Sequence, residues 1–194
     1  MHDQMLMTLH IRFSRSHGAH PALDGAAASC CLRTTTTTIN MSLTIQSQNK
    51  VFEGVLTKYS FRSKVLGGLE AKMNVFLPES ANAGHKVPVL YFLSGLTCTE
   101  DNAAQKGHFF EAAAKEQLAI VFPDTSPRGA NIPGEEDSWD FGTGAGFYVN
   151  ATKEPWNKYY NMYDHVLKEI PQLIASEQIP IDVSRASIFG HSMG

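Results

Sequence analysis

The 194-residue sequence has no apolar run long enough to cross a lipid bilayer, which takes about 20 residues. It also has no excess of positive charge, because 16 lysines and arginines face 19 aspartates and glutamates and the formal net charge is −3. A membrane-spanning protein is therefore disfavoured, and so is a protein whose main partner is nucleic acid or an anionic membrane. Hydrophobic residues make up 43% of the chain, which is enough for one sizeable core. We expect a soluble, single-domain protein.

Cysteine is scarce. The three cysteines, Cys30, Cys31 and Cys98, are an odd number at spacings that match no common metal site, and adjacent cysteines rarely form a disulfide with each other. This usage predicts free thiols in a reducing compartment, with the cytosol as the expected location, and it predicts no metal site.

The first forty residues differ from the rest of the chain, because no helical or strand period persists in them and they include a run of threonines at 34–38. We expect residues 1–41 to be a disordered N-terminal extension and residues 42–194 to form the globular part. Two other interpretations remain open. The Arg and Ser content loosely resembles an organelle transit peptide. Alternatively, Met41 is the usual start, and the residues before it come from an upstream start.

Alternating apolar and polar residues at 50–62 and 71–77, separated by a glycine-containing turn, predict two antiparallel strands. Continuous apolar runs at 87–93 and 118–123 are typical of buried parallel strands. Between these two runs, residues 101–117 have the period and alanine content of a helix.

A second helix is predicted at about 159–176, where Pro171 should introduce a kink. A further apolar strand at 186–189 follows it. This order of elements predicts an α/β protein with a mainly parallel, doubly wound sheet and antiparallel N-terminal strands.

The last five residues read Gly-His-Ser-Met-Gly, directly after that apolar strand. This is the pattern of the nucleophile elbow of the α/β-hydrolase fold, a sharp turn that exposes the serine oxygen. Ser192 is therefore the candidate nucleophile. A side chain at Gly190 or Gly194 would collide with neighbouring backbone in such a turn. A glycine-rich turn without catalytic function is the alternative.

Acyl transfer needs two donors for the oxyanion, and in this fold one comes from the loop after an inner strand. The loop that begins at residue 94 has the right place, with Gly95 permitting close backbone approach and Leu96 N–H as the expected donor. Met193 N–H would be the other. An ordinary strand-to-helix turn is the alternative for this loop. Cys98 lies in the same loop, where it is either a small residue near the active site or a buried, inert thiol.

Four segments together resemble the S-formylglutathione hydrolase family, also called esterase D; they are residues 92–99, 123–129, 138–149 and 190–194. The resemblance covers residues 42–194. It implies a cytosolic serine thioesterase with no cofactor, which cleaves S-formylglutathione to glutathione and formate in formaldehyde detoxification. Members of the family also hydrolyse small carboxylic esters, and members of such families often form homodimers.

By motif match, the resemblance assigns the nucleophile to Ser192 and the oxyanion donors to Leu96 and Met193. The loop at 139–148 resembles the family's active-site wall. Its aromatic residues would exclude water around the thioester, although structural packing explains them equally well; they are Trp139, Phe141 and Phe147. Arg128 would pair with a glutathione carboxylate or, alternatively, form a structural ion pair.

The family's triad Asp and His follow the serine in chain order, and no counterpart precedes Gly194. We therefore expect the N-terminal part of an α/β-hydrolase domain with its C-terminal part missing, and little or no turnover from it. His191 is expected to point away from the nucleophile, and His108 and His165 to be solvated or packed. The alternatives are a general small-ester carboxylesterase or acyltransferase, and an inactive truncated product.

Overall fold

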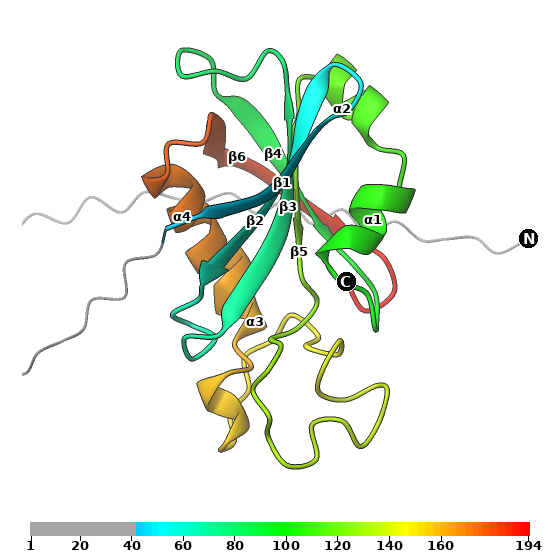
Figure 1. The fold of residues 1–194 in the computed structure, drawn as a ribbon, viewed down its shortest axis with the longest axis vertical. Coiled ribbons are helices and arrows are strands. Elements are labelled where there is room, and N and C mark those ends of the chain that lie inside the picture. The colour runs from blue at the N-terminus through cyan, green and yellow to red at the C-terminus, as the bar shows by residue number, and fades with distance from the viewer. Residues whose placement is uncertain (1–41) are drawn as a thin grey trace, which may run out of the picture.

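A computed structural model describes residues 42–194, which form a six-stranded sheet with helices on both faces (Figure 1). The strands are β1 (Thr44–Lys50), β2 (Gly54–Arg62), β3 (Glu70–Pro78), β4 (Val87–Leu93), β5 (Ala119–Pro123) and β6 (Ile181–Gly190). The helices are α1 (Glu100–Lys106), α2 (Phe110–Lys115), the 3₁₀-helix η1 (Trp156–Lys158), α3 (Met162–Asp164), the π-helix η2 (His165–Glu169) and α4 (Ile170–Ser176). The expectations for residues 1–41, including free thiols at Cys30 and Cys31, lie outside the described residues.

The strand order is β1-β2-β3-β5-β4-β6. The pairs β1–β2, β2–β3 and β3–β5 are antiparallel. β4 lies between β5 and β6 and is parallel to both. The α/β class and the antiparallel start are confirmed. Within the described residues the sheet is mixed, with three antiparallel pairings and two parallel ones, and the antiparallel pairing of β1 is one that the sequence pattern did not show.

The two central strands have the burial that their apolar sequences predict. All five residues of β5 are buried, and β4 alternates between the two faces of the sheet. On one face, Val89 and Tyr91 join the core formed with η2 and α4. On the other face, Phe92 packs with residues of α1 and α2. The sheet is therefore covered on both sides, which is the arrangement that buried parallel strands require.

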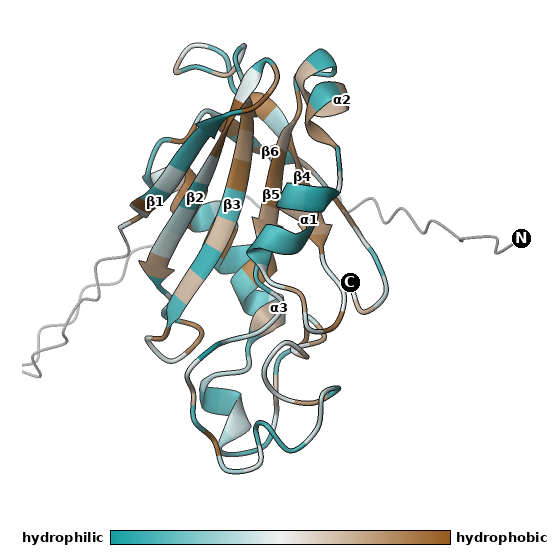
Figure 2. Cartoon of the chain, turned by 45° about the vertical axis from the view of Figure 1, so that its right-hand side comes forward, coloured by the Kyte–Doolittle hydropathy of each residue, from teal (hydrophilic) through white to brown (hydrophobic). Residues whose placement is uncertain are grey.

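Polar β1 escaped prediction because all seven of its residues are exposed and no apolar alternation marks it. Figure 2 shows it mostly in teal and white at the edge of the sheet, whereas the inner strand β5 is mostly brown. Its backbone pairs with β2 from Thr44↔Ser60 to Lys50↔Val55. A chain reversal around Phe52, whose φ is 50°, separates the two strands, so the single strand expected at 50–62 is wrong at its start.

The two predicted helices are both interrupted. The first breaks between α1 and α2, where His108 takes a left-handed φ of 53°. The second begins at Met162 and widens into the π-helix η2 just before Pro171. Proline has no N–H to continue the helical hydrogen-bond ladder, and a π-helical segment accommodates such a defect without ending the helix. Among the described residues, no helix is both long and apolar enough to cross a membrane.

Candidate active site

Three parallel strands end at one edge of the sheet. β4 ends at Leu93, β5 at Pro123 and β6 at Gly190, and the chain leaves the sheet on the same side after each of them. In open α/β sheets, ligands bind in the crevice outside the carboxyl ends of parallel strands. The three loops that follow, beginning at residues 94, 124 and 191, therefore lie where a site is expected (Figure 1).

Ser192 lies in a strained turn at the end of β6. Its φ is 61°, in the left-handed region that is costly for residues other than glycine. The turn is held by a hydrogen bond from His191 N–H to Leu93 O at 3.1 Å, and by one from Gly194 N–H to His191 O at 3.2 Å. Ser192 itself is exposed. A strained, exposed serine at a strand end is the geometry that nucleophilic attack requires.

The two flanking glycines are sterically required. A Cβ at Gly190 would lie 2.4 Å from the carbonyl carbon of Gly194, and a Cβ at Gly194 would lie 2.1 Å from Leu93 O. Cβ contacts this short with backbone atoms do not occur. The predicted collision is therefore present at both positions.

The loop after β4 lies directly against the serine. A Cβ at Gly95 would lie 3.1 Å from Ser192 Cβ and 3.5 Å from its Oγ. In the part of the chain that the structure describes, neither Leu96 N–H nor Met193 N–H donates to a backbone carbonyl. Both predicted oxyanion donors thus belong to turns that meet at Gly95 and Ser192.

Backbone strain gathers around this loop. Of the nine left-handed residues other than glycine among residues 42–194, four lie in the segments that meet here: Thr97, Phe147, Tyr148 and Ser192. Thr97 N–H donates to Gly144 O at 2.9 Å, and the Tyr148 hydroxyl donates to Ser94 O at 2.9 Å. Strained residues persist where surrounding contacts over-determine them, and they cluster at functional sites.

A hydrogen-bond network joins the loop after β4 to the loop after β5. Gly144 N–H donates to Ser126 Oγ at 2.7 Å, and Gly146 N–H donates to Thr125 O at 3.2 Å. The Thr125 hydroxyl donates to Cys98 O at 2.5 Å. The backbone of the candidate oxyanion loop is therefore fixed from outside itself.

Arg128 is part of the same network. Its Nε and Nη2 donate to the Asp124 carboxylate at 2.7 and 2.8 Å, and Nη2 also donates to Cys98 O at 3.1 Å. These bonds to Asp124 raise the pKa of the guanidinium, so it stays charged. Of the two interpretations of Arg128, this geometry favours the structural ion pair.

Tyr148 is a buried donor to this loop. Burial raises the pKa of its hydroxyl, and the nearby Asp124 carboxylate raises it further. The phenol therefore keeps its proton at neutral pH and remains a donor to Ser94 O.

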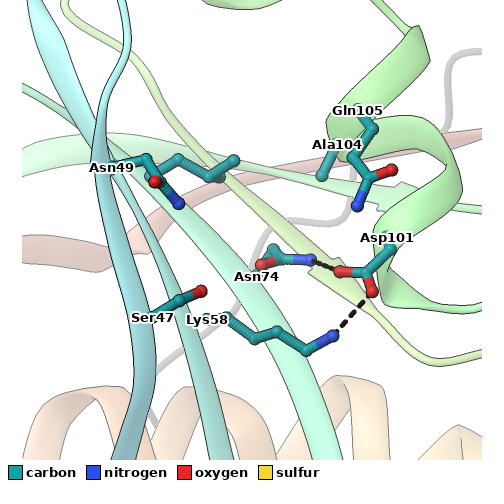
Figure 3. Close-up of a pocket in the computed structure, with 8 residues that line it drawn as sticks. Ser47, Asn49, Lys58, Asn74, Asp101, Ala104 and Gln105 are labelled. Carbon is teal, nitrogen blue, oxygen red and sulfur yellow. Dashed lines mark hydrogen bonds and ion pairs between the residues drawn. The ribbon is translucent and has the colours of Figure 1, made fainter.

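The far end of the loop is held where α1 begins. Lys58 Nζ lies 2.7 Å from Glu100 Oε1 and 2.6 Å from Asp101 Oδ2, and Asn74 Nδ2 donates to Glu100 O at 2.9 Å. Figure 3 shows Lys58 and Asn74 pointing from neighbouring strands toward Asp101. These side chains border a polar pocket of about 240 Å³. The pocket lies between β1–β3 and α1, and its lining does not include Ser192.

The predicted aromatic wall is open in this structure. Trp139 is 70% exposed and Phe141 is 52% exposed, and Phe141 packs edge-on against Trp156 with ring centroids 4.8 Å apart. Phe147 is 48% exposed. A role of Trp139 and Phe141 in excluding water from a substrate stays a prediction.

Among the residues that the structure describes, no histidine side chain is hydrogen-bonded to Ser192. His165 is 1% exposed, lies 2.7 Å from Glu169 Oε2 through Nδ1, and stacks on Phe61. His108 is exposed on the turn between α1 and α2. Among residues 42–194, no three His, Cys, Asp or Glu side chains gather as a metal site would need.

The sequence reasoning missed the residues that fix the loop, chiefly Thr125, Ser126 and Tyr148. They lie within the segments 123–129 and 138–149, which carry the family resemblance, but the sequence alone predicts no role for them. Their position in the sequence could have indicated this role. Thr125 and Ser126 come just after a buried strand, and the carboxyl ends of parallel strands lie together at one edge of the sheet, where ligands bind.

Comparison with known proteins gives a consistent result. The protein-family model named Esterase matches residues 63–194. An S-formylglutathione hydrolase of Mus musculus is 53% identical over 154 residues, covering 79% of this chain and 54% of that protein. One of Arabidopsis thaliana is 50% identical over 145 residues, covering 75% and 50%.

A solved structure of an S-formylglutathione hydrolase from Agrobacterium tumefaciens superposes with a TM-score of 0.72 at 45% identity, covering 77% of this chain and 53% of that one. The likeness in fold and the match to the family model confirm the α/β-hydrolase class. The chain spans about half the length of the curated relatives it matches.

Proposed function

Because this chain belongs to the Esterase family, we propose that Ser192 is the nucleophile of a serine thioesterase that hydrolyses S-formylglutathione to glutathione and formate. The observation that carries the proposal is the left-handed, exposed Ser192 in a turn that only glycines can flank, in contact with Gly95. The names of the relatives at 50–53% identity support the glutathione thioester as substrate.

In this mechanism, Ser192 Oγ attacks the formyl carbonyl carbon and a general base takes the hydroxyl proton. The N–H groups of Leu96 and Met193 donate to the oxyanion that develops on the carbonyl oxygen. Collapse of the tetrahedral species breaks the C–S bond, and the glutathione sulfur leaves with a proton from the same base. Water then attacks the formyl ester on Ser192 and releases formate.

The general base is not assigned to a residue of this chain. The resemblance places the family's acid and base after the serine, and the described histidines are committed elsewhere or exposed. The residues described here thus supply the nucleophile and the oxyanion donors of the proposed site. We further propose that the enzyme works in the cytosol and completes glutathione-dependent formaldehyde detoxification by releasing formate and glutathione.

The test compares turnover of S-formylglutathione and of an aryl acetate by the protein expressed from its complete reading frame. We expect S-formylglutathione to be the better substrate. Ser192→Ala should lower kcat on both substrates by about a thousandfold or more. If the aryl ester is better by a wide margin, the glutathione assignment fails; if Ser192→Ala retains full activity, the nucleophile assignment fails.

A further inference from the structure

We infer that Arg128 is a positioning residue, which holds the oxyanion loop through the main-chain carbonyl of Cys98 and does not bind a substrate carboxylate. The inference rests on the proposed function, because it concerns the loop that carries Leu96 N–H. It assigns to Arg128 an effect on the rate of acyl transfer for any substrate, with no effect on recognition of glutathione.

The first step is that the guanidinium is already engaged. Three N–H groups are used, two on the Asp124 carboxylate and one on Cys98 O, out of the five that an arginine carries. Asp124 is 8% exposed on its side chain. The two N–H groups that are left are both on Nη1, so a substrate carboxylate could pair with this one nitrogen but not with the bidentate fork, which Asp124 occupies.

The second step is that Asp124 anchors the guanidinium to the sheet. Asp124 follows directly after β5, and its N–H donates to Lys72 O of β3 at 3.3 Å. Its Oδ1 accepts from Thr125 N–H at 2.6 Å. The side chain of Arg128 therefore bridges the end of β5 and the loop after β4.

The third step concerns what the Cys98 carbonyl controls. Cys98 N–H donates to Gly95 O at 3.3 Å, and this closes a four-residue turn with Leu96 and Thr97 in the middle. Thr97 occupies the third position of this turn with φ 64°, where glycine is preferred. A β-branched residue is strained in this region, so the turn needs outside contacts to keep its shape.

Three hydrogen bonds from outside the turn hold it in this shape. Thr97 N–H is held by Gly144 O, and the carbonyl at the end of the turn is held by the Thr125 hydroxyl and Arg128 Nη2. Loss of the Arg128 bond leaves Cys98 O with one partner. The turn is then free to relax, and the Leu96 N–H moves with it.

The chain contains a matched control. Arg185 Nε donates to Asp182 Oδ2 at 2.8 Å, and its Nη2 donates to Lys86 O at 2.9 Å, so it too bridges an aspartate and a main-chain carbonyl. This bridge joins the start of β6 to the residue before β4, at the opposite end of those strands from Ser192. Arg185→Ala therefore removes the same chemistry without touching the oxyanion loop.

The kinetic test uses the enzyme from the complete reading frame with two substrates, an aryl acetate without a carboxylate and S-formylglutathione with two. Arg128→Ala should lower kcat about tenfold or more on both, with KM changed less than about twofold, because misplacing an oxyanion donor costs rate. Arg128→Lys should recover only part of the loss, since one ammonium cannot reproduce the planar fork. Arg185→Ala should stay within about twofold of the parent.

A rise in KM for S-formylglutathione alone, with the aryl acetate unaffected, would show that Arg128 binds substrate and would overturn the inference. Unchanged kinetics on both substrates would overturn it too. If the parent enzyme hydrolyses neither substrate, the proposed function fails, and the inference is then decided by amide hydrogen exchange. Thr97 N–H should exchange about tenfold faster in Arg128→Ala than in Arg185→Ala; equal rates in the two variants reject the positioning role.

Discussion

Gly95 lies so close to Ser192 that a methyl group at residue 95 would come within 3.1 Å of the serine Cβ and 3.5 Å of its hydroxyl oxygen. The main chain of His191 is equally near, with its carbonyl oxygen 3.3 Å from the same position. The loop after β4 and the turn after β6 are therefore packed so closely that a side chain at residue 95 would displace one of them.

Gly95→Ala should accordingly lower kcat on an aryl acetate by about tenfold or more, because a shift of a few tenths of an ångström misaligns nucleophile and donor. The free energy of unfolding should change by less than about 1 kcal/mol, as judged from urea titrations. Gly84→Ala is the control, since the nearest atom to its added Cβ is Asn82 Oδ1 at 3.5 Å. Equal kcat values for the two variants would show that the contact has no part in catalysis.

Ser192→Gly should make the protein more stable while it abolishes turnover. The left-handed φ of 61° is strained for serine and free for glycine, so the free energy of unfolding should rise by about 1 kcal/mol. Ser192→Ala removes the same hydroxyl without relieving the strain and should show no such gain. A stability of Ser192→Gly at or below that of Ser192→Ala would mean that the turn stores no strain.

Glu169 should make the fold sensitive to acid. It is 3% exposed, accepts bonds from Ser63 Oγ at 2.5 Å and Lys64 N–H at 2.6 Å, and lies 2.7 Å from His165 Nδ1. Burial alone would raise the pKa of Glu169, but the bonds from His165 and Ser63 outweigh it and the pKa is lowered. Because the folded pKa lies below the unfolded value of about 4.3, the carboxylate stabilises the fold above that pH. This contribution is lost as the pH falls through the folded pKa.

Glu169→Gln should lower the free energy of unfolding at neutral pH by about 2 kcal/mol, because buried donors lose a charged acceptor. It should also flatten the fall in stability on acidification, measured as the urea midpoint at a series of pH values. Glu111→Gln is the control: Glu111 pairs with Lys115 on the surface and should change the profile little. Parallel pH profiles for the parent and Glu169→Gln would contradict the assignment.

Lys58 should matter far more to stability than other surface lysines. It pairs with Glu100, whose side chain is 4% exposed, and Lys58→Met would leave that carboxylate buried without its cation. The expected cost is about 3 kcal/mol in the free energy of unfolding. Lys50→Met removes a pair with Glu79 in which both side chains are exposed, so it should cost little. Similar urea midpoints for the two variants would disprove the buried pair's role.

Elements that carry their own hydrophobic signal were predictable. β4 occupies residues 87–93 as the apolar run indicated, because both faces of an inner strand must be apolar. β1 carries no such signal, since its side chains are exposed and only backbone pairing with β2 makes it a strand. The break after α1 was hidden as well, because the alanine content and the helical period continue past Gly107 and His108, although α1 ends there and His108 has a left-handed φ of 53°.

The same division applies to the candidate site. Ser192 and its flanking glycines were predictable because the sharp turn is a local feature with a fixed spacing. The bond from Arg128 to Cys98 O was not, because it depends on how two loops far apart in sequence come together. The sequence indicated that Arg128 binds a carboxylate, but it could not distinguish a carboxylate of the substrate from one within the chain.

The pairing of β6 with β4 also has a consequence for synthesis of the chain. The register joins Val87 to Ile181 and Leu93 to Gly190, and α1 to α4 and the long loop after β5 are all made between these strands. While the chain grows on the ribosome, one edge of β4 therefore has no partner until β6 emerges, so the serine turn is the last part of the described fold to form. During that interval β4 presents open backbone donors and acceptors to chaperones and to other nascent chains.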